Sequence, residues 1–279
     1  MPAPARPAPA RPAPARPSPT PTLRSLPLSA LKLRGERALR SIGLYEDLKR
    51  LLIEDDFRFR VPEVGSVHAT ADRVLFLNLT FWGAGEASDV LVEPVLDADV
   101  LTHAAWHHAA RRALADGATP SAAALFLGEA VASAFDAYLV GQLLRQGKQT
   151  DFLKTQLPAM TEAMLGAGLE EEAVQALFAR MAEDPDAAFE ALRGLLFEVS
   201  LALYRAPDLD AAAAVLAAAA EHPFAGLLHH YALSAWVLYA RAYAGPEREV
   251  DPAVELDRAL RAAPVALDHL AQAWLRGGG

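Results

Sequence analysis

The chain of 279 residues contains no cysteine. Disulfides, thiolate catalysis and cysteine-bound zinc or iron–sulfur clusters are therefore excluded, and any metal must bind histidine or carboxylate side chains. The sequence also lacks a run of about 20 apolar residues free of charge, and it lacks the apolar N-terminal region of a secretory signal. We therefore expect no membrane-spanning helix, and either a cytoplasmic protein or one exported without a cleavable signal peptide.

Positive charge is not in excess either. The net charge is −9 and the isoelectric point is about 5.4. This balance argues against a general nucleic-acid binder. Hydrophobic residues make up 53% of the chain, which is enough to bury a substantial core in one large domain or two small ones.

The N-terminal segment has a composition of its own. Residues 2–16 are three copies of P-A-P-A-R, and proline continues at alternate positions to Pro21. Proline removes backbone donors and favours extended polyproline II, so we expect residues 1–22 to form a disordered arm. Such an arm is either a solubilising linker or a docking or secretion segment.

The rest of the chain predicts a small sheet followed by helices. Residues 57–61 alternate strictly, residues 73–82 are rich in aromatic and branched side chains, and a third short strand is expected near 90–92. From Asp97 onward the pattern is helical almost to the end, with breaks that proline or glycine marks, as at Asp184-Pro185 and Ala263-Pro264. We predict an α+β fold that is predominantly α-helical, with its small sheet at about 57–92. The expected divisions are 23–150, with the sheet and a helical hairpin, and 151–279, a C-terminal helical subdomain.

Two histidines stand four residues apart on the first long helix. Asp97 or Asp99 can cap this helix, and it carries His103 and His107. At about 100° per residue the two imidazoles lie about 40° apart on one face, one turn from each other. This spacing allows both to bind a single metal ion.

A glutamate on the following helix extends this pattern. That helix is expected to begin after a short loop with Thr119 as its cap and Pro120 as its first residue, so the two helices should form an antiparallel hairpin. At about 1.5 Å per residue from the loop, Glu129 is level with His107 and can complete a His-His-Glu site. Ser133 or Asp136 would then hydrogen-bond a ligating imidazole. The alternative is a structural hydrogen bond that Glu129 accepts from a histidine or arginine.

The stretch His103-Ala104-Ala105-Trp106-His107, followed by Glu129, resembles the gluzincin type of zincin metallopeptidase over residues 73–136. In that family a glutamate on the next helix completes the site of an H-E-x-x-H helix. The resemblance implies Zn²⁺ on His103, His107 and Glu129, and it places Ala104 where the general base belongs. It therefore implies peptide hydrolysis by metal-activated water if position 104 were Glu. As written, the chain would be a nearly inactive peptidase, either a natural pseudoenzyme or an inactivated mutant.

The sequence also contains two further candidate site residues, and it is compatible with other functions. His230 and Tyr231 lie in an apolar helical run and can stabilise an oxyanion, as zincins often require; packing is the alternative for both. Two histidines and a carboxylate are also the ligand set of non-haem iron oxygenases, although a helical hairpin is unlike the barrel usual there. The main alternative is a non-enzymatic helical adaptor that binds a protein through its C-terminal helices or its Pro-rich arm.

Overall fold

A computed structural model describes residues 22–63, 65, 70, 74, 90–115 and 119–276. Most of the arm expected at 1–22 and nearly all of the strand expected at 73–82 therefore lie outside the described residues. The described part is predominantly helical, with a few short strands near the N-terminus, so the predicted α+β class is confirmed.

The strands are short and form two separate pairs. They are β1 (Leu23–Pro27), β2 (Lys32–Arg34), β3 (Arg58–Pro62) and β4 (Val95–Asp97). β1 pairs with β3 in antiparallel fashion, and β2 pairs with β4 in parallel fashion. β3 matches the strand predicted at 57–61. The strand expected near 90–92 was wrong, because only Val90 forms an isolated bridge, to Arg60.

Helices account for most of the remaining described residues. In the N-terminal part they are α1 (Glu36–Leu39), α2 (Tyr45–Glu54) and the short η1 (Leu28–Ala30). The long central helices are α4 (Ala98–Leu114), α5 (Ala122–Arg145), α6 (Asp151–Gly166), α7 (Glu171–Glu183) and α8 (Pro185–Arg205). The C-terminal helices are α9 (Leu209–Ala219), η2 (Ala225–His230), α10 (Leu233–Tyr243), α11 (Pro252–Ala262), α12 (Ala266–Leu270) and the π-helical turn η3 (Ala271–Arg276).

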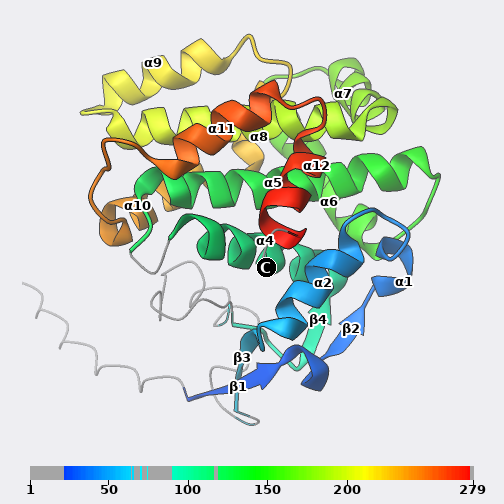
Figure 1. Cartoon of the computed structure of the whole chain (residues 1–279). Helices are drawn as coiled ribbons and strands as arrows, with labels where there is room; N and C mark the ends of the chain where they lie inside the picture. The colour runs from blue at the N-terminus through cyan, green and yellow to red at the C-terminus, as the bar shows by residue number, and fades with distance from the viewer. Residues whose placement is uncertain are drawn as a thin grey trace, which may run out of the picture.

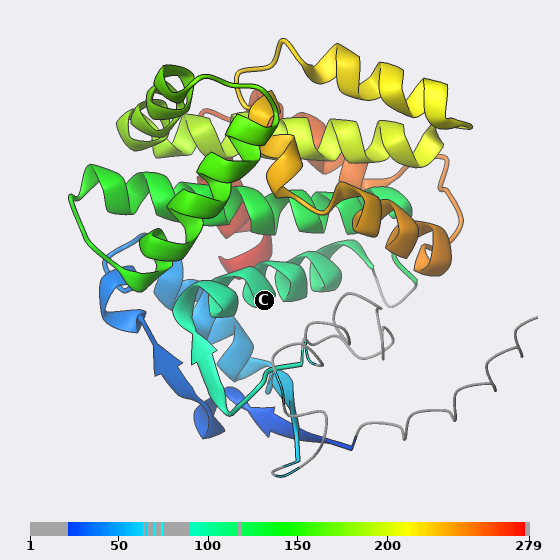
Figure 2. The same cartoon turned by 180° about the vertical axis from the view of Figure 1, so that it is seen from behind.

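Four of these helices form successive layers. α4, α5, α8 and α9 lie one above another in both views, with the strands and α2 next to α4 (Figures 1 and 2). α11 and α12 cover one face of this stack (Figure 1). α6, η2 and α10 cover the opposite face (Figure 2). α5 is therefore enclosed on several sides.

The position of α5 explains its composition. Among the described helices, only α5 is long and apolar enough to cross a membrane, yet 83% of its most apolar window is buried inside the protein. Gly141 on this helix allows a close approach of α7, because an added Cβ would lie 2.3 Å from the carbonyl oxygen of Met181. α5 is thus the central core helix of the fold.

The caps of the two site helices differ from those expected. Ser121, not Thr119, caps α5 by accepting a hydrogen bond from the Ala124 amide at 3.1 Å. Asp97 occupies the N-cap position of α4 but makes no side-chain cap bond. Its carboxylate accepts instead from Arg34 Nη2 at 2.7 Å, because the pairing of β2 with β4 places these two residues side by side.

Candidate metal centre

The facing sides of α4 and α5 bring two imidazoles and a carboxylate together. His107 Nε2 lies 3.1 Å from His103 Nε2 and 3.6 Å from Glu129 Oε2. The ligating atoms of all three residues lie within 4.8 Å of one another. Ligands about 2.0–2.1 Å from a tetrahedral zinc ion would stand about 3.3 Å apart. Two of the three separations are close to that value, so the group could hold a metal ion.

The pairing of residues across the two helices defines their direction. His103 meets Asp136 and His107 meets Glu129, so residue numbers rise along α4 while they fall along α5. The predicted antiparallel arrangement is therefore present. It places Glu129 level with His107, as the rise per residue requires.

A glycine beside Glu129 allows the helices to approach closely. An added Cβ at Gly128 would lie 3.3 Å from the Ala110 Cβ and 3.9 Å from His107 Nδ1. On the inner side of α4, Trp106 is fully buried, and its ring meets that of Phe135 edge-on with centroids 5.4 Å apart. Small residues near the site and large ones behind it thus set the spacing of the hairpin.

Asp136 supports one of the two imidazoles from behind. Its Oδ2 lies 2.8 Å from His103 Nδ1. An ionised carboxylate only accepts hydrogen bonds, so Nδ1 carries the proton and Nε2 presents its lone pair toward His107 and Glu129. Metal-binding histidines commonly have such a carboxylate partner, which fixes both tautomer and ring orientation.

The cluster is accessible as well as ordered. The side chains of His103, His107 and Glu129 are 29%, 35% and 31% exposed. An ion or a small ligand can therefore reach the ligating atoms from solvent. The neighbouring His108 faces elsewhere, as its position on the helix predicts, and its Nε2 lies 2.6 Å from Asp55 Oδ2.

Two residues near the cluster were not identified from the sequence as parts of it. Burial raises the pKa of Asp99 to about 6, and the nearby Asp136 adds to this effect while His103 opposes it. Burial also raises the pKa of Tyr239 on α10, with Arg111 opposing the shift and Glu129 adding to it. Asp99 had a usable signal, since it precedes His103 by one helical turn. Tyr239 had none, because only the packing of α10 brings it near Glu129.

The remaining candidate residues lie around this centre without an assigned role. Ala104 follows His103 on α4 and is partly buried against the core. His230 ends η2, where burial lowers its pKa and Asp136 opposes the shift. The Tyr231 hydroxyl donates to the backbone oxygen of Ser133 at 3.5 Å, and burial raises its pKa. Ser133 itself is buried on α5.

Known proteins offer no independent guide to this site. No protein-family model, curated protein or solved structure matches the chain. The side chains and their geometry therefore carry the functional argument.

Proposed function

We propose that this chain is a zinc-binding protein of metallopeptidase ancestry, with His103, His107 and Glu129 as the zinc ligands. The convergence of these three side chains within 4.8 Å carries the proposal. The Asp136 carboxylate supports it, because it directs the His103 lone pair toward the other two ligands. Two imidazoles and one carboxylate leave a fourth coordination position, the arrangement typical of catalytic rather than structural zinc sites.

The chemistry at this centre is limited by Ala104. A zinc ion supplies Lewis acidity that makes a bound water a stronger acid. Peptide hydrolysis then requires a neighbouring group that takes the proton and returns it to the leaving amine. The methyl side chain of Ala104 can do neither. The proposed protein therefore binds zinc but does not hydrolyse peptides by the glutamate-assisted route.

Metal content tests the ligand assignment. We expect the untagged full chain, purified without chelator, to contain one zinc ion per chain by plasma mass spectrometry. His107→Ala and Glu129→Ala should lower the zinc content to background, whereas His229→Ala, which removes an exposed histidine outside the cluster, should retain it. Absence of zinc from the unaltered chain, together with no binding of added zinc, would overturn the assignment.

A substitution at position 104 tests the proposed ancestry. Ala104→Glu should raise hydrolysis of a mixed peptide library about 10²–10⁴-fold over the unaltered chain, which is the usual contribution of a positioned base. Ala104→Gln is the matched control, since it has a similar size but no carboxylate to accept the proton. If both variants bind zinc and neither cleaves peptides, the metal site stands and the peptidase ancestry is wrong.

A further inference from the structure

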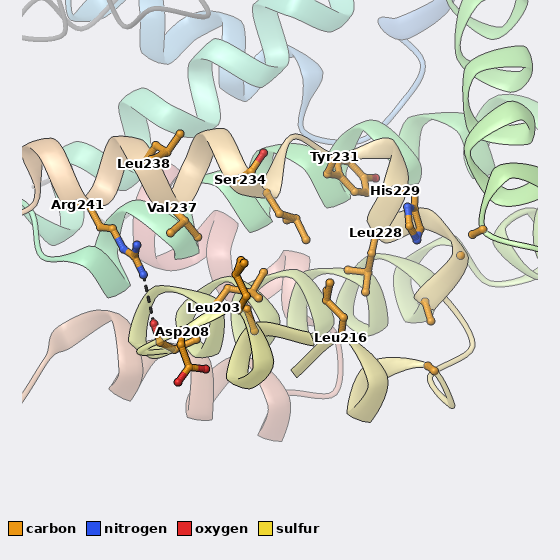
Figure 3. A pocket seen from close by; sticks show the side chains of 18 of the residues that line it. Leu203, Asp208, Leu216, Leu228, His229, Tyr231, Ser234, Val237, Leu238 and Arg241 are labelled. Atoms are coloured by element: carbon orange, nitrogen blue, oxygen red, sulfur yellow. Dashed lines mark hydrogen bonds between the residues drawn. The ribbon is translucent and has the colours of Figure 1, made fainter. Parts of the chain in front are cut away.

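An apolar groove lies on the far side of the helical stack from the strands. It has a volume of about 820 Å³ and lies between α9 and the segment formed by η2 and α10. Figure 3 shows Leu203 and Leu216 on one wall, facing Leu228 and Val237 on the other. None of the three proposed zinc ligands lines this groove, so it is a separate site.

The groove exposes apolar surface that a soluble helical protein normally buries. α9 contains no buried residue, although it is made almost entirely of alanine and leucine. At the groove, Leu209 is 88% exposed, Leu216 44% and Leu238 61%. Contiguous exposed apolar surface of this kind marks a binding site, because leaving it in water is unfavourable.

The two ends of the groove differ in charge. Arg241 lies at one end and His229 at the other (Figure 3). The Arg241 Nη2 donates to the backbone oxygens of Tyr204 and Ala206 at 3.3 and 3.4 Å, which holds the guanidinium at the rim. Backbone oxygens carry no net charge, so these two bonds do not neutralise the guanidinium, and the remaining N–H donors of the fork suit a carboxylate.

The acidic residue at the same end caps a helix. Asp208 lines the groove, but its Oδ1 caps α9 by accepting from the Ala211 amide at 2.8 Å. The positive end of the α9 dipole offsets this negative charge. Arg241 therefore remains the group at this end that favours an anion.

We propose that the groove binds a long-chain fatty acid, with its hydrocarbon chain between α9 and α10 and its carboxylate at Arg241. The volume lies within the range of small-molecule sites, roughly 300–1,000 Å³. The aliphatic side chains on both walls match the hydrocarbon of an acyl chain. Arg241 is the only lysine or arginine among the described residues that line the groove, and it matches one anionic headgroup.

Direct binding of radiolabelled palmitate to the full chain, after removal of bound lipid, tests the proposal. Equilibrium dialysis below the critical micelle concentration should give saturable binding with one site per chain. Affinity should rise roughly tenfold at each step from laurate to myristate to palmitate, because each step buries two further methylenes. Saturable binding that is independent of chain length, or no binding of any of the three, would contradict an acyl groove.

Two pairs of variants separate the chain from the headgroup. Ala212→Phe should fill the groove and abolish palmitate binding, whereas Ala214→Phe, on an exposed face of α9 that does not line the groove, should leave it unchanged. Arg241→Gln should weaken palmitate binding about tenfold or more, the value of a charge-assisted hydrogen bond. Arg258→Gln, an exposed arginine on α11, is the matched control.

A neutral ligand completes the test. The uncharged alcohol hexadecanol should bind the unaltered chain about tenfold more weakly than palmitate, and Arg241→Gln should remove that difference. Equal binding of acid and alcohol to the unaltered chain would overturn the headgroup assignment. Binding of an apolar helical peptide that palmitate does not displace, in the absence of palmitate binding, would identify the groove as a protein-docking surface instead. Unchanged helical content by circular dichroism shows that the variants are folded.

Discussion

Two of the clusters of ionisable side chains that lie between helices differ in which charges they bring together. In the first, Arg193 on α8 is completely buried. Its Nε and Nη2 donate to Glu190 at 2.7 and 2.6 Å, and its Nη1 lies 2.8 Å from Asp257 on α11. Arg261 Nε donates to the other oxygen of Asp257 at 3.0 Å. We call these four residues the arginine cluster; within it each cation faces a carboxylate.

The second cluster is the metal centre, where the groups brought together are all possible metal ligands. The ligand atoms of two imidazoles and a carboxylate lie within 4.8 Å of one another, and each side chain is about a third exposed. Burial opposes the charge of Arg193, yet Glu190 and Asp257 outweigh it and raise the pKa of the guanidinium. The arginine cluster thus supplies its own cations. The metal centre instead gathers two imidazole nitrogens and a carboxylate oxygen, a set of ligand atoms that could hold a metal ion.

The largest expected effect concerns the arginine cluster. Arg193→Met should lower the free energy of unfolding by about 3 kcal/mol, the lower end of the range for breaking a buried ion pair, because the partly buried Glu190 would lose the guanidinium while the buried Asp257 would retain Arg261. Urea denaturation measures this loss. Arg258→Met is the matched control: its pair with Glu255 is exposed, so a change of about 0–1 kcal/mol is expected. A loss of similar size in both variants would show that the buried cluster has no special structural weight.

Zinc should have the next largest effect, and it should act only through the metal centre. Zinc at 100 times its dissociation constant should stabilise the unaltered chain by about 2.7 kcal/mol, since it binds the folded state. His107→Ala should lose this stabilisation, and Arg193→Met should keep it, because the two clusters share no residue. Thermal unfolding with and without zinc provides the measurement. An equal shift in His107→Ala would mean that zinc binds elsewhere.

The fold could be predicted where the sequence pattern is local. Alternation identified β3, and proline and glycine marked the breaks between the later helices. β1, β2 and β4 were missed because each is only three to five residues long and gains its hydrogen bonds from a strand far along the chain. The cap of α5 was misplaced by two residues, since Thr119 and Ser121 have the same capping chemistry and only the backbone conformation selects between them.

The site could be predicted as far as helical geometry extends. The four-residue spacing placed His103 and His107 on one face, and the rise along the hairpin placed Glu129 level with them. The sequence left open whether Ser133 or Asp136 would hydrogen-bond a ligating imidazole. The structure gives this contact to Asp136, because Ser133 lies buried one turn away, where its backbone oxygen accepts from Tyr231. Tyr239 required the packing of α10, which no local pattern encodes.

Asp136 provides a smaller and more specific test of the metal centre. Asp136→Asn preserves the shape of the side chain but weakens its hold on His103 Nδ1, so zinc affinity should fall about 10–100-fold. Competition with a fluorescent zinc chelator measures this change. Glu162→Gln removes an exposed carboxylate on α6 and should leave zinc affinity unchanged. Equal affinity in Asp136→Asn and the unaltered chain would mean that Asp136 does not orient the ligand.

The smallest expected effect tests whether the spacing of α4 and α5 sets the metal geometry. Gly128→Ala adds a methyl group 3.3 Å from the Ala110 Cβ, so α4 must shift slightly away from Glu129. The higher helix propensity of alanine, up to about 1 kcal/mol, offsets the crowding, so overall stability should change little. Zinc affinity should still fall severalfold, because His107 moves with α4. Gly166→Ala, at the end of α6 where an added methyl group meets nothing within 4 Å, is the matched control and should keep full affinity. If zinc affinity survives Gly128→Ala intact, the ligands adjust independently of helix spacing, and the hairpin only presents the metal centre without shaping it.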